Sequence, residues 1–153
     1  MEEITLVIPG TPISKKRPRF FRRGKFVGTY NCQETEEGRF MWELKSQLPK
    51  GFALIARGVP VILKCQFFFP IPRSASKKRQ ALMEEHKIKH TNTPDLDNCI
   101  KFVKDCMTSI VWQDDCQVVR ESSMKEYSDT PKTVIMIELK HHEPIRQTRG
   151  KKK

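Results

Sequence analysis

The segment Asn98-Cys-Ile-Lys-Phe-Val-Lys-Asp-Cys-Met-Thr-Ser109 alternates apolar and polar side chains with the period of an α-helix. Its apolar residues recur three or four positions apart, the spacing that places side chains on one helix face. With the residue that follows the segment, they are Cys99, Ile100, Phe102, Val103, Cys106, Met107 and Ile110. The other face carries Asp97, Lys101, Lys104, Asp105 and Thr108. We therefore predict an amphipathic helix packed on a core.

Acidic residues lie on both sides of this helix in an otherwise basic chain. Thr93-Pro-Asp-Leu-Asp97 precedes it, and Asp114-Asp115 follows it where a turn meets the next predicted strand. If Pro94 keeps the chain extended, Asp95 and Asp97 emerge on the same side and face one ion. Asp97 is the predicted N-cap, and Lys101 stands one turn later on its face.

These residue types suit chemistry on a phosphodiester. Carboxylates repel phosphate, so a basic protein that gathers them needs a divalent cation such as Mg²⁺, which takes carboxylate, water and phosphate oxygens. Asp115 offers a third carboxylate, and Lys101 could stabilise the transition state or position the attacking water. Each acid alone also fits ordinary capping or a polar turn. Together with Lys101 they indicate a metal-dependent nuclease site.

The formal charge of +11 is concentrated in three groups, which suit sequence-independent contacts to DNA phosphates. The first group is Lys15, Lys16, Arg17, Arg19, Arg22, Arg23 and Lys25. The second is Arg73, Lys77, Lys78, Arg79, Lys87 and Lys89, and the third is Arg146, Arg149 and Lys151 to Lys153. Two interpretations of Phe20, Phe21 and Phe26 remain open: the rings stack on unpaired bases, or they hold the basic loop on the core.

The cysteines and two histidines have plainer interpretations. The five cysteines are odd in number and form no C-x-x-C pair, which predicts free thiols. Cys99 and Cys106 fit core packing better than a soft metal site. His86 and His90 are four apart but lack the further ligands of known zinc motifs, so we interpret them as structural.

The element pattern predicts an α+β (mixed α/β) fold, a single compact domain with helices packed on a mixed or mostly antiparallel sheet. Besides the amphipathic helix, the expected elements are strands at 4–8, 26–30, 59–69, 118–127 and 133–140, and a helix at about 33–47. The turn at Ser128-Asp-Thr-Pro131 predicts that the last two strands form an antiparallel hairpin. We expect the domain to span residues 1–145 and a disordered basic tail to span 146–153. No apolar run is long enough to cross a bilayer and the amino terminus does not resemble a signal peptide, so we expect no membrane partner and a cytoplasmic protein.

The pattern P-D-x-D-N-x-x-K-x-x-x-D, followed by D-D-x-Q-V, resembles the RusA family of Holliday junction resolvases. It is carried by Pro94, Asp95, Asp97, Asn98, Lys101, Asp105, Asp114, Asp115, Gln117 and Val118. Pro9-Gly-Thr-Pro12, Lys16-Arg-Pro-Arg19 and Lys125-Glu-Tyr127 are similar to further family features. The chain departs from the family at Thr93, where many relatives carry a basic residue, and at Ser109-Ile110, which replaces a turn that is often Asn-Gly.

This resemblance implies that Asp95, Asp97 and Asp115 bind Mg²⁺, with Mn²⁺ as an alternative ion, and that Lys101 is the essential basic residue. Asn98 and Asp114 would be supporting members of the site. The implied activity is resolution of four-way branched DNA in recombination and repair. Because this takes two symmetric cuts, we expect a two-fold homodimer, with the predicted hairpin or the first helix as candidate interface.

Two alternatives share parts of this pattern. A noncatalytic branched-DNA-binding protein would use the basic groups alone, with the acids serving as caps. A Mg²⁺-dependent nuclease acting on other branched or flap DNA would use the same chemistry on a different substrate.

Overall fold

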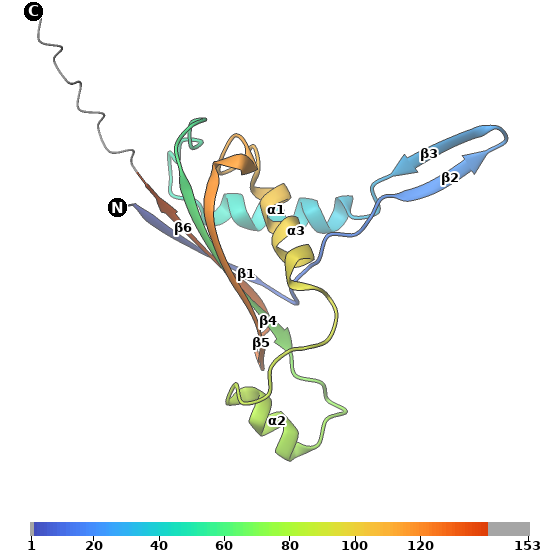
Figure 1. Ribbon diagram of the computed structural model, residues 1–153, viewed down its shortest axis with the longest axis vertical. Coiled ribbons are helices and arrows are strands. Elements are labelled where there is room, and N and C mark those ends of the chain that lie inside the picture. The colour runs from blue at the N-terminus through green and yellow to red at the C-terminus, as the bar shows by residue number, and fades with distance from the viewer. Residues whose placement is uncertain (1, 141–153) are drawn as a thin grey trace, which may run out of the picture.

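A four-stranded mixed sheet with the order β1-β6-β4-β5 forms the centre of the protein (Figure 1). The computed structural model describes residues 2–140, so the predicted tail at 146–153 lies outside the described residues. The strands of this sheet are β1 (Glu3–Pro9), β4 (Val61–Pro70), β5 (Val118–Ser128) and β6 (Lys132–Leu139). The helices are α1 (Glu34–Gln47), α2 (Lys77–Glu84), α3 (Leu96–Met107) and a short 3-10 helix, η1 (Asp115–Gln117). The predicted α+β class is confirmed.

Strand β4 lies inside the sheet and pairs on both sides, antiparallel with β6 and parallel with β5. Its run of β-branched and aromatic residues, Val-Ile-Leu-Lys-Cys-Gln-Phe-Phe-Phe-Pro, suits this position. The predicted hairpin of the last two strands is therefore wrong, because β4 lies between β5 and β6. The turn signal correctly marked a reversal of the chain, but it carries no information about which strands pair.

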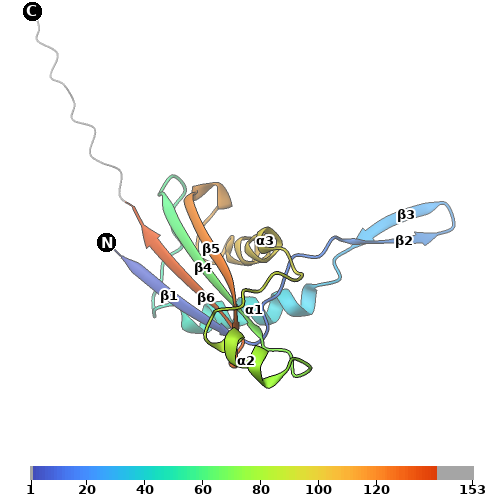
Figure 2. The same cartoon turned by 60° about the horizontal axis from the view of Figure 1, so that its bottom comes forward.

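Helices α1 and α3 cover one face of the sheet (Figure 2). The connection from β4 to its parallel neighbour β5 must cross that face, and α3 is part of the crossover. All six apolar residues that α3 contributes to the predicted stripe are buried, and the ring of Phe102 meets that of Phe40 of α1 edge to face, with centroids 5.2 Å apart. The amphipathic helix and its buried face are thus confirmed.

The start of α3 differs from the prediction by two residues. Asp95, with φ −66° and ψ 144°, is the N-cap residue, and Asp97 lies inside the first turn. The extended backbone therefore ends at Asp95, so the expected alternation of an extended chain does not relate the two acids. A carboxylate in the first turn is still favoured by the helix dipole, which explains how Asp97 fits there without capping.

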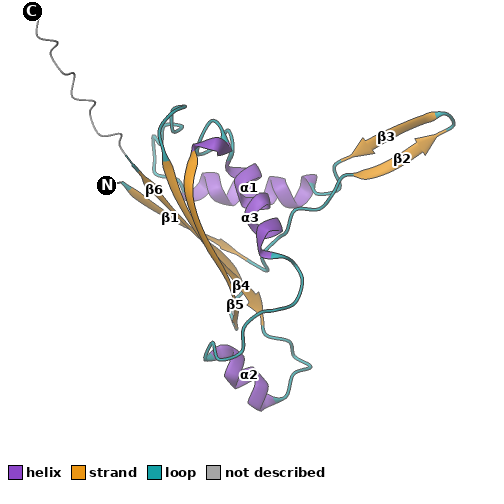
Figure 3. Ribbon diagram, viewed as in Figure 1, coloured by secondary structure: helices purple, strands orange, loops and turns teal. Residues whose placement is uncertain are grey.

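A second, two-stranded sheet projects from the body (Figure 3). It consists of β2 (Arg19–Arg23) and β3 (Phe26–Tyr30), which pair antiparallel. We call residues 19–30 the arm. All of β2 is exposed, so the interpretation in which its aromatic rings hold the loop on the core is excluded. Strand β3 was predicted, whereas β2 was not.

Within residues 2–140, no helix is both long enough and apolar enough to cross a bilayer.

Candidate active site and nucleic-acid interface

Asp95, Asp97 and Lys101 are exposed to solvent at and just after the amino end of α3. Asp97 and Lys101 are four residues apart in the helix and so neighbour each other on its surface. The carboxylate of Asp95 makes no capping hydrogen bond. Within residues 2–140, none of the three side chains forms an ion pair. Two carboxylates and one ammonium group are therefore free to meet a ligand, at a helix end that also favours anions.

Strand β5 holds the segment that leads into Asp95. The Nζ atom of Lys125 donates hydrogen bonds to the carbonyl oxygens of Asn92, at 2.8 Å, and Pro94, at 2.9 Å. These bonds place the ammonium group close to the start of α3. Burial raises the pKa of the Cys99 thiol to about 11, and the charge of Lys125 lowers it in part. Lys125 was not among the predicted site residues. The only signal for it was the resemblance of Lys125-Glu-Tyr127 to the family.

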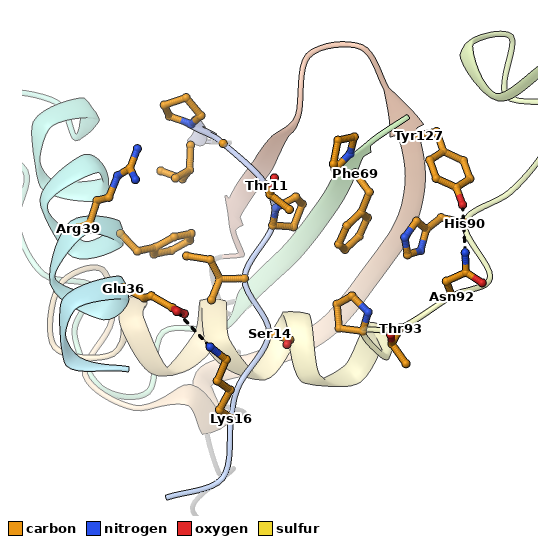
Figure 4. Close-up of a pocket in the computed structure, with 18 of the residues that line it drawn as sticks. Thr11, Ser14, Lys16, Glu36, Arg39, Phe69, His90, Asn92, Thr93 and Tyr127 are labelled. Atoms are coloured by element: carbon orange, nitrogen blue, oxygen red, sulfur yellow. Dashed lines mark hydrogen bonds and ion pairs between the residues drawn. The ribbon is translucent and has the colours of Figure 1, made fainter. Parts of the chain in front are cut away.

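His90 fixes the same segment a few residues earlier (Figure 4). Its ring stacks on that of Phe69 with centroids 4.1 Å apart and meets the ring of Tyr127 at 5.0 Å. Asn92 donates a hydrogen bond of 3.5 Å to the hydroxyl of Tyr127. Burial, followed by the charge of Lys125, lowers the pKa of His90, so this imidazole stays neutral at pH 7. His90 therefore acts as a packing residue.

A groove of about 930 Å³ opens next to this segment (Figure 4). Its walls come from the end of β1 and the chain after it, one side of α1, the end of β4 and the loop before α3. It is lined partly by charged and polar side chains, including Lys16, Glu36, Arg39 and Thr93, and otherwise by apolar side chains. Since Pro94 is part of the wall, the groove leads to the residue that precedes Asp95.

Asp114 has a clear local role at the start of η1. Its Oδ1 atom accepts a hydrogen bond of 3.0 Å from the backbone amide of Cys116, and this bond holds the pKa of Asp114 below its usual value. In return, Oε1 of Gln117 accepts a bond of 3.0 Å from the amide of Asp114, which completes a capping box. Buried Gln117 also donates to the carbonyl oxygen of Ala56 at 2.8 Å. These contacts fix the turn that carries Asp115.

Asp115 lies near the carboxyl end of α3, away from Asp95 and Asp97. It lines a small hollow with Asp105 and Thr108 of the last turns of that helix. Across residues 2–140, no three His, Cys, Asp or Glu side chains gather closely enough to hold a metal ion. The structure thus brings Asp95 and Asp97 to one end of α3 but does not bring Asp115 to them.

The hollow beside Asp115 contains a cation supplied by the chain. The Nζ atom of Lys15 lies 3.1 Å from Oδ2 of Asp105 and 3.2 Å from Oε1 of Glu37. Burial lowers the pKa of Lys15, but its bonds to Asp105 and Glu37 outweigh that effect and raise it overall. The backbone amide of Lys15 also donates to the carbonyl oxygen of Asn98 at 2.9 Å. Lys15 therefore connects the chain before the arm to α3. Its side chain contacts Asp105, and its backbone amide contacts Asn98.

The exposed acids at the start of α3 are a suitable donor set for Mg²⁺. This ion prefers hard oxygen ligands and is commonly bound by one or two carboxylates, completed by water and substrate phosphate. Asp95 and Asp97 meet that requirement without a third protein ligand. They fit Mg²⁺, and equally Mn²⁺, better than a soft metal.

The thiols do not compete for this role. Burial raises the pKa of Cys65 and of Cys106 to about 12, so both stay protonated in the core. All five cysteines are free thiols, as predicted. His86 follows α2, which ends at Glu84, so His86 and His90 do not share one helical face.

The basic groups differ in how far their charge is compensated. In the first group, Lys15 is paired as described and Lys16 lies 3.1 Å from Glu36. Five of its cations are exposed and form no ion pair within the described part of the chain: Arg17, Arg19, Arg22, Arg23 and Lys25. In the second group, Lys77, Lys78 and Arg79 are exposed in the first turn of α2, which contains no acid. These cations thus lie on or directly before the arm and in the first turn of α2.

An acid pair at a helix end, with a groove beside it and exposed cations elsewhere on the surface, is an arrangement suited to acting on phosphodiesters. The chain belongs to the endodeoxyribonuclease RusA family, whose model matches residues 9–138, and it is therefore a nuclease. This confirms the resemblance drawn from the residues. The chain is also similar to the uncharacterised protein YqaN of Bacillus subtilis (strain 168), with 29% identity over 139 residues that cover 90% of this chain and 96% of YqaN.

Proposed function

We propose that the protein is a Mg²⁺-dependent Holliday junction resolvase that cuts four-way branched DNA by paired symmetric phosphodiester hydrolysis, in recombination and repair. The observation that carries this proposal is the uncompensated pair Asp95 and Asp97, exposed at the amino end of α3 with Lys101 one turn away. Capping alone does not account for the pair, since the carboxylate of Asp95 caps nothing. Membership of an endodeoxyribonuclease family gives the pair a chemical purpose.

Each residue of this group has a definite task. Asp95 and Asp97 would hold Mg²⁺, which supplies Lewis-acid stabilisation and a more acidic bound water. Lys101 places a positive charge where a phosphate oxygen gains negative charge in the transition state. Lys125 keeps the backbone before Asp95 at a fixed position. Asn98 would be a supporting member, and its backbone carbonyl oxygen accepts a hydrogen bond from the Lys15 amide, which ties the same turn to the chain before the arm.

Asp115 enters the proposal as a third acid of the reaction. The family resemblance implies that it binds the metal, whereas in the structure it neighbours Asp105. We propose that it acts once DNA is bound and that the ion site of the free protein consists of Asp95 and Asp97. Asp114 supports it by capping the turn.

The DNA would be held through its phosphates. The exposed cations of the arm and of α2 lie at two projections of the molecule, so a branched substrate can be contacted at separate places (Figure 1). Such contacts supply affinity without reading sequence. The groove beside Pro94 would lead one strand to Asp95.

Two symmetric cuts require two sites, so we propose a two-fold homodimer. The first helix remains a candidate interface because Trp42 of α1 is 67% exposed. The other predicted candidate, the hairpin of the last two strands, does not exist in the sheet. A cytoplasmic location is part of the same proposal, and free thiols fit a reducing compartment.

A panel of labelled DNAs tests the proposal. The protein is incubated with four-way, three-way, flap and linear duplex DNA, each with and without Mg²⁺. The proposal predicts Mg²⁺-dependent paired nicks in the four-way junction and little cutting of the others. Faster cutting of flap DNA would replace the resolvase with a flap nuclease. Tight junction binding without cutting in any divalent ion would support the noncatalytic alternative.

A further inference from the structure

The arm carries aromatic rings on both of its faces, and the two faces are not equivalent. Pairing places Phe21 opposite Gly28, and Phe20 opposite Thr29. Since successive side chains of a strand alternate between faces, Phe20 and Phe21 point to opposite sides of the hairpin. The figures show the arm away from the main sheet (Figures 1 and 2).

On the face with Phe21 the aromatic rings contact one another, although Phe26 is 63% and Tyr30 is 47% exposed. The ring of Phe21 lies 6.0 Å from that of Phe26 and 6.3 Å from that of Tyr30, measured between centroids. A Cβ atom at Gly28 would stand 2.6 Å from Cζ of Phe21, so the ring fits there only because Gly28 has no side chain. A ring placed across a strand glycine in this way stabilises a hairpin. We therefore assign Phe21 to the structure of the arm.

The opposite face has no such partner. Phe20 is 76% exposed and makes no ring contact within residues 2–140. Val27, its diagonal neighbour across the pair, is 60% exposed. Arg22, opposite Val27, adds a cation to the same face. This face thus combines a free aromatic ring with positive charge, the combination that binds unstacked bases.

The base of the arm is fixed to the body rather than hinged. Gln33 is buried, and its side chain accepts a bond of 2.7 Å from the amide of Lys16 and donates one of 2.8 Å to the carbonyl oxygen of Ser14. Asn31, which directly follows β3, donates to Glu37 of α1 at 2.9 Å. Because the neighbouring Lys15 amide bonds to Asn98, the arm leaves the body at a position set by α3.

The charge of the arm indicates which class of ligand it binds. Residues 17–30 contain five cations and no acid, so the same segments of two copies would repel each other. A polyanion is favoured instead. Duplex DNA offers phosphates but no open base face, whereas a branch point offers both.

We propose that Phe20 stacks on an unpaired base at the branch point of the DNA, while Phe21 maintains the shape of the arm. This inference rests on the proposed function, because it takes branched DNA as the ligand. Under this proposal, the preference of the protein for branched over linear DNA depends on the ring of Phe20.

The test uses four-way junctions that carry 2-aminopurine either at the branch point or inside one duplex arm, without divalent ions so that no strand is cut. Stacking on the probe changes its fluorescence. We expect the wild-type protein to change the signal of the branch-point probe alone, and Phe20→Ala and Phe20→Leu to abolish that change. Phe20→Tyr should restore it, since a ring is required rather than apolar bulk. Val119→Ala is the control, an exposed apolar residue of β5 outside the arm.

Affinity gives a second measurement. One lost stack should weaken junction binding by Phe20→Ala about tenfold and leave linear-duplex binding unchanged. An unaltered branch-point signal with Phe20→Ala overturns the inference even if wild-type protein cuts junctions. A change in oligomeric state with Phe20→Ala, seen by sedimentation, overturns it in favour of a protein–protein contact. If Phe20→Ala loses the branch-point signal and the wild-type protein cuts no DNA, the inference is supported and the proposed catalysis is rejected.

Discussion

The ammonium group of Lys125 on β5 donates a hydrogen bond of 2.9 Å to the carbonyl oxygen of Pro94, the residue directly before Asp95. A second bond of 2.8 Å to Asn92 holds the same segment from two points. The central sheet therefore determines where the backbone of α3 begins. The acid pair has a rigid support even though its side chains are exposed.

Replacing Lys125 by methionine should remove both hydrogen bonds that hold the segment before Asp95. Loss of two charge-assisted bonds is expected to cost about 2 kcal/mol of unfolding free energy. It should also raise the Mg²⁺ concentration for half-maximal cleavage by about 10–100-fold, the usual effect of losing an outer partner of metal ligands. Urea unfolding and a Mg²⁺ titration of cleavage measure the two effects.

Two further variants make this test specific. Lys125→Arg keeps the charge and the donors and should retain most of the activity. Lys64→Met removes an exposed lysine of β4 and should change neither quantity. A Mg²⁺ requirement of Lys125→Met equal to that of the wild type would show that Lys125 only stabilises the fold.

Asp97 and Asp115 should differ in the free protein although both matter for cutting. Only Asp97 lies beside Asp95, so Asp97→Asn should weaken binding of Mn²⁺ to DNA-free protein, whereas Asp115→Asn should not. Electron paramagnetic resonance of free Mn²⁺ measures this directly. Equal weakening by both variants would place Asp115 in the same ion site before DNA binds.

The arginines of the arm should act through phosphates. Changing Arg19, Arg22 and Arg23 to glutamine removes three cations that form no ion pair within residues 2–140. The slope of log affinity against log salt concentration should fall by about 3, similarly for unrelated DNA sequences.

The matched control changes Lys45, Lys50 and Lys64 to glutamine, with the same loss of charge on other elements. Its salt slope should stay close to that of the wild type. Equal slopes for the two triple variants would mean that the arm does not contact DNA.

Ser109 is a site where stability can be gained. Its φ of 72° is left-handed, and its amide donates to the carbonyl oxygen of Trp112 at 2.7 Å, which closes the turn after α3. Ser109→Gly should stabilise the protein by about 0.5–1 kcal/mol, because glycine adopts this backbone without steric cost. Urea unfolding measures the effect. Ser46→Gly, inside α1, is the control and should destabilise instead.

Local patterns predicted the elements, and long-range contacts determined what was missed. The stripe from Cys99 to Met107 identified α3 because every buried residue follows one period. Strand β2 carries no such signal, since all of it is exposed. The two-residue turn of Gly24 and Lys25 was the available indication of a hairpin.

Only those parts of the candidate site that are local in sequence could be predicted. Asp95, Asp97 and Lys101 are close in sequence, so a helix alone brings them together. The bonds of Lys125 to Asn92 and Pro94 join residues more than 30 positions apart and depend on β5 being next to β4. A turn motif also cannot specify pairing, and the order β6-β4-β5 therefore could not be obtained from Ser128 to Pro131.

Cleavage of a four-way junction labelled on opposing strands tests the central claim most directly. Wild-type protein and Asp97→Asn are compared with and without Mg²⁺, beside a linear duplex, and junction binding of both proteins is measured in parallel. We predict paired symmetric nicks from the wild type only with Mg²⁺, and unaltered binding without cutting by Asp97→Asn, which loses one ligand charge but keeps its shape. Cutting by Asp97→Asn at the wild-type rate would contradict the assignment of the acid pair as the metal site.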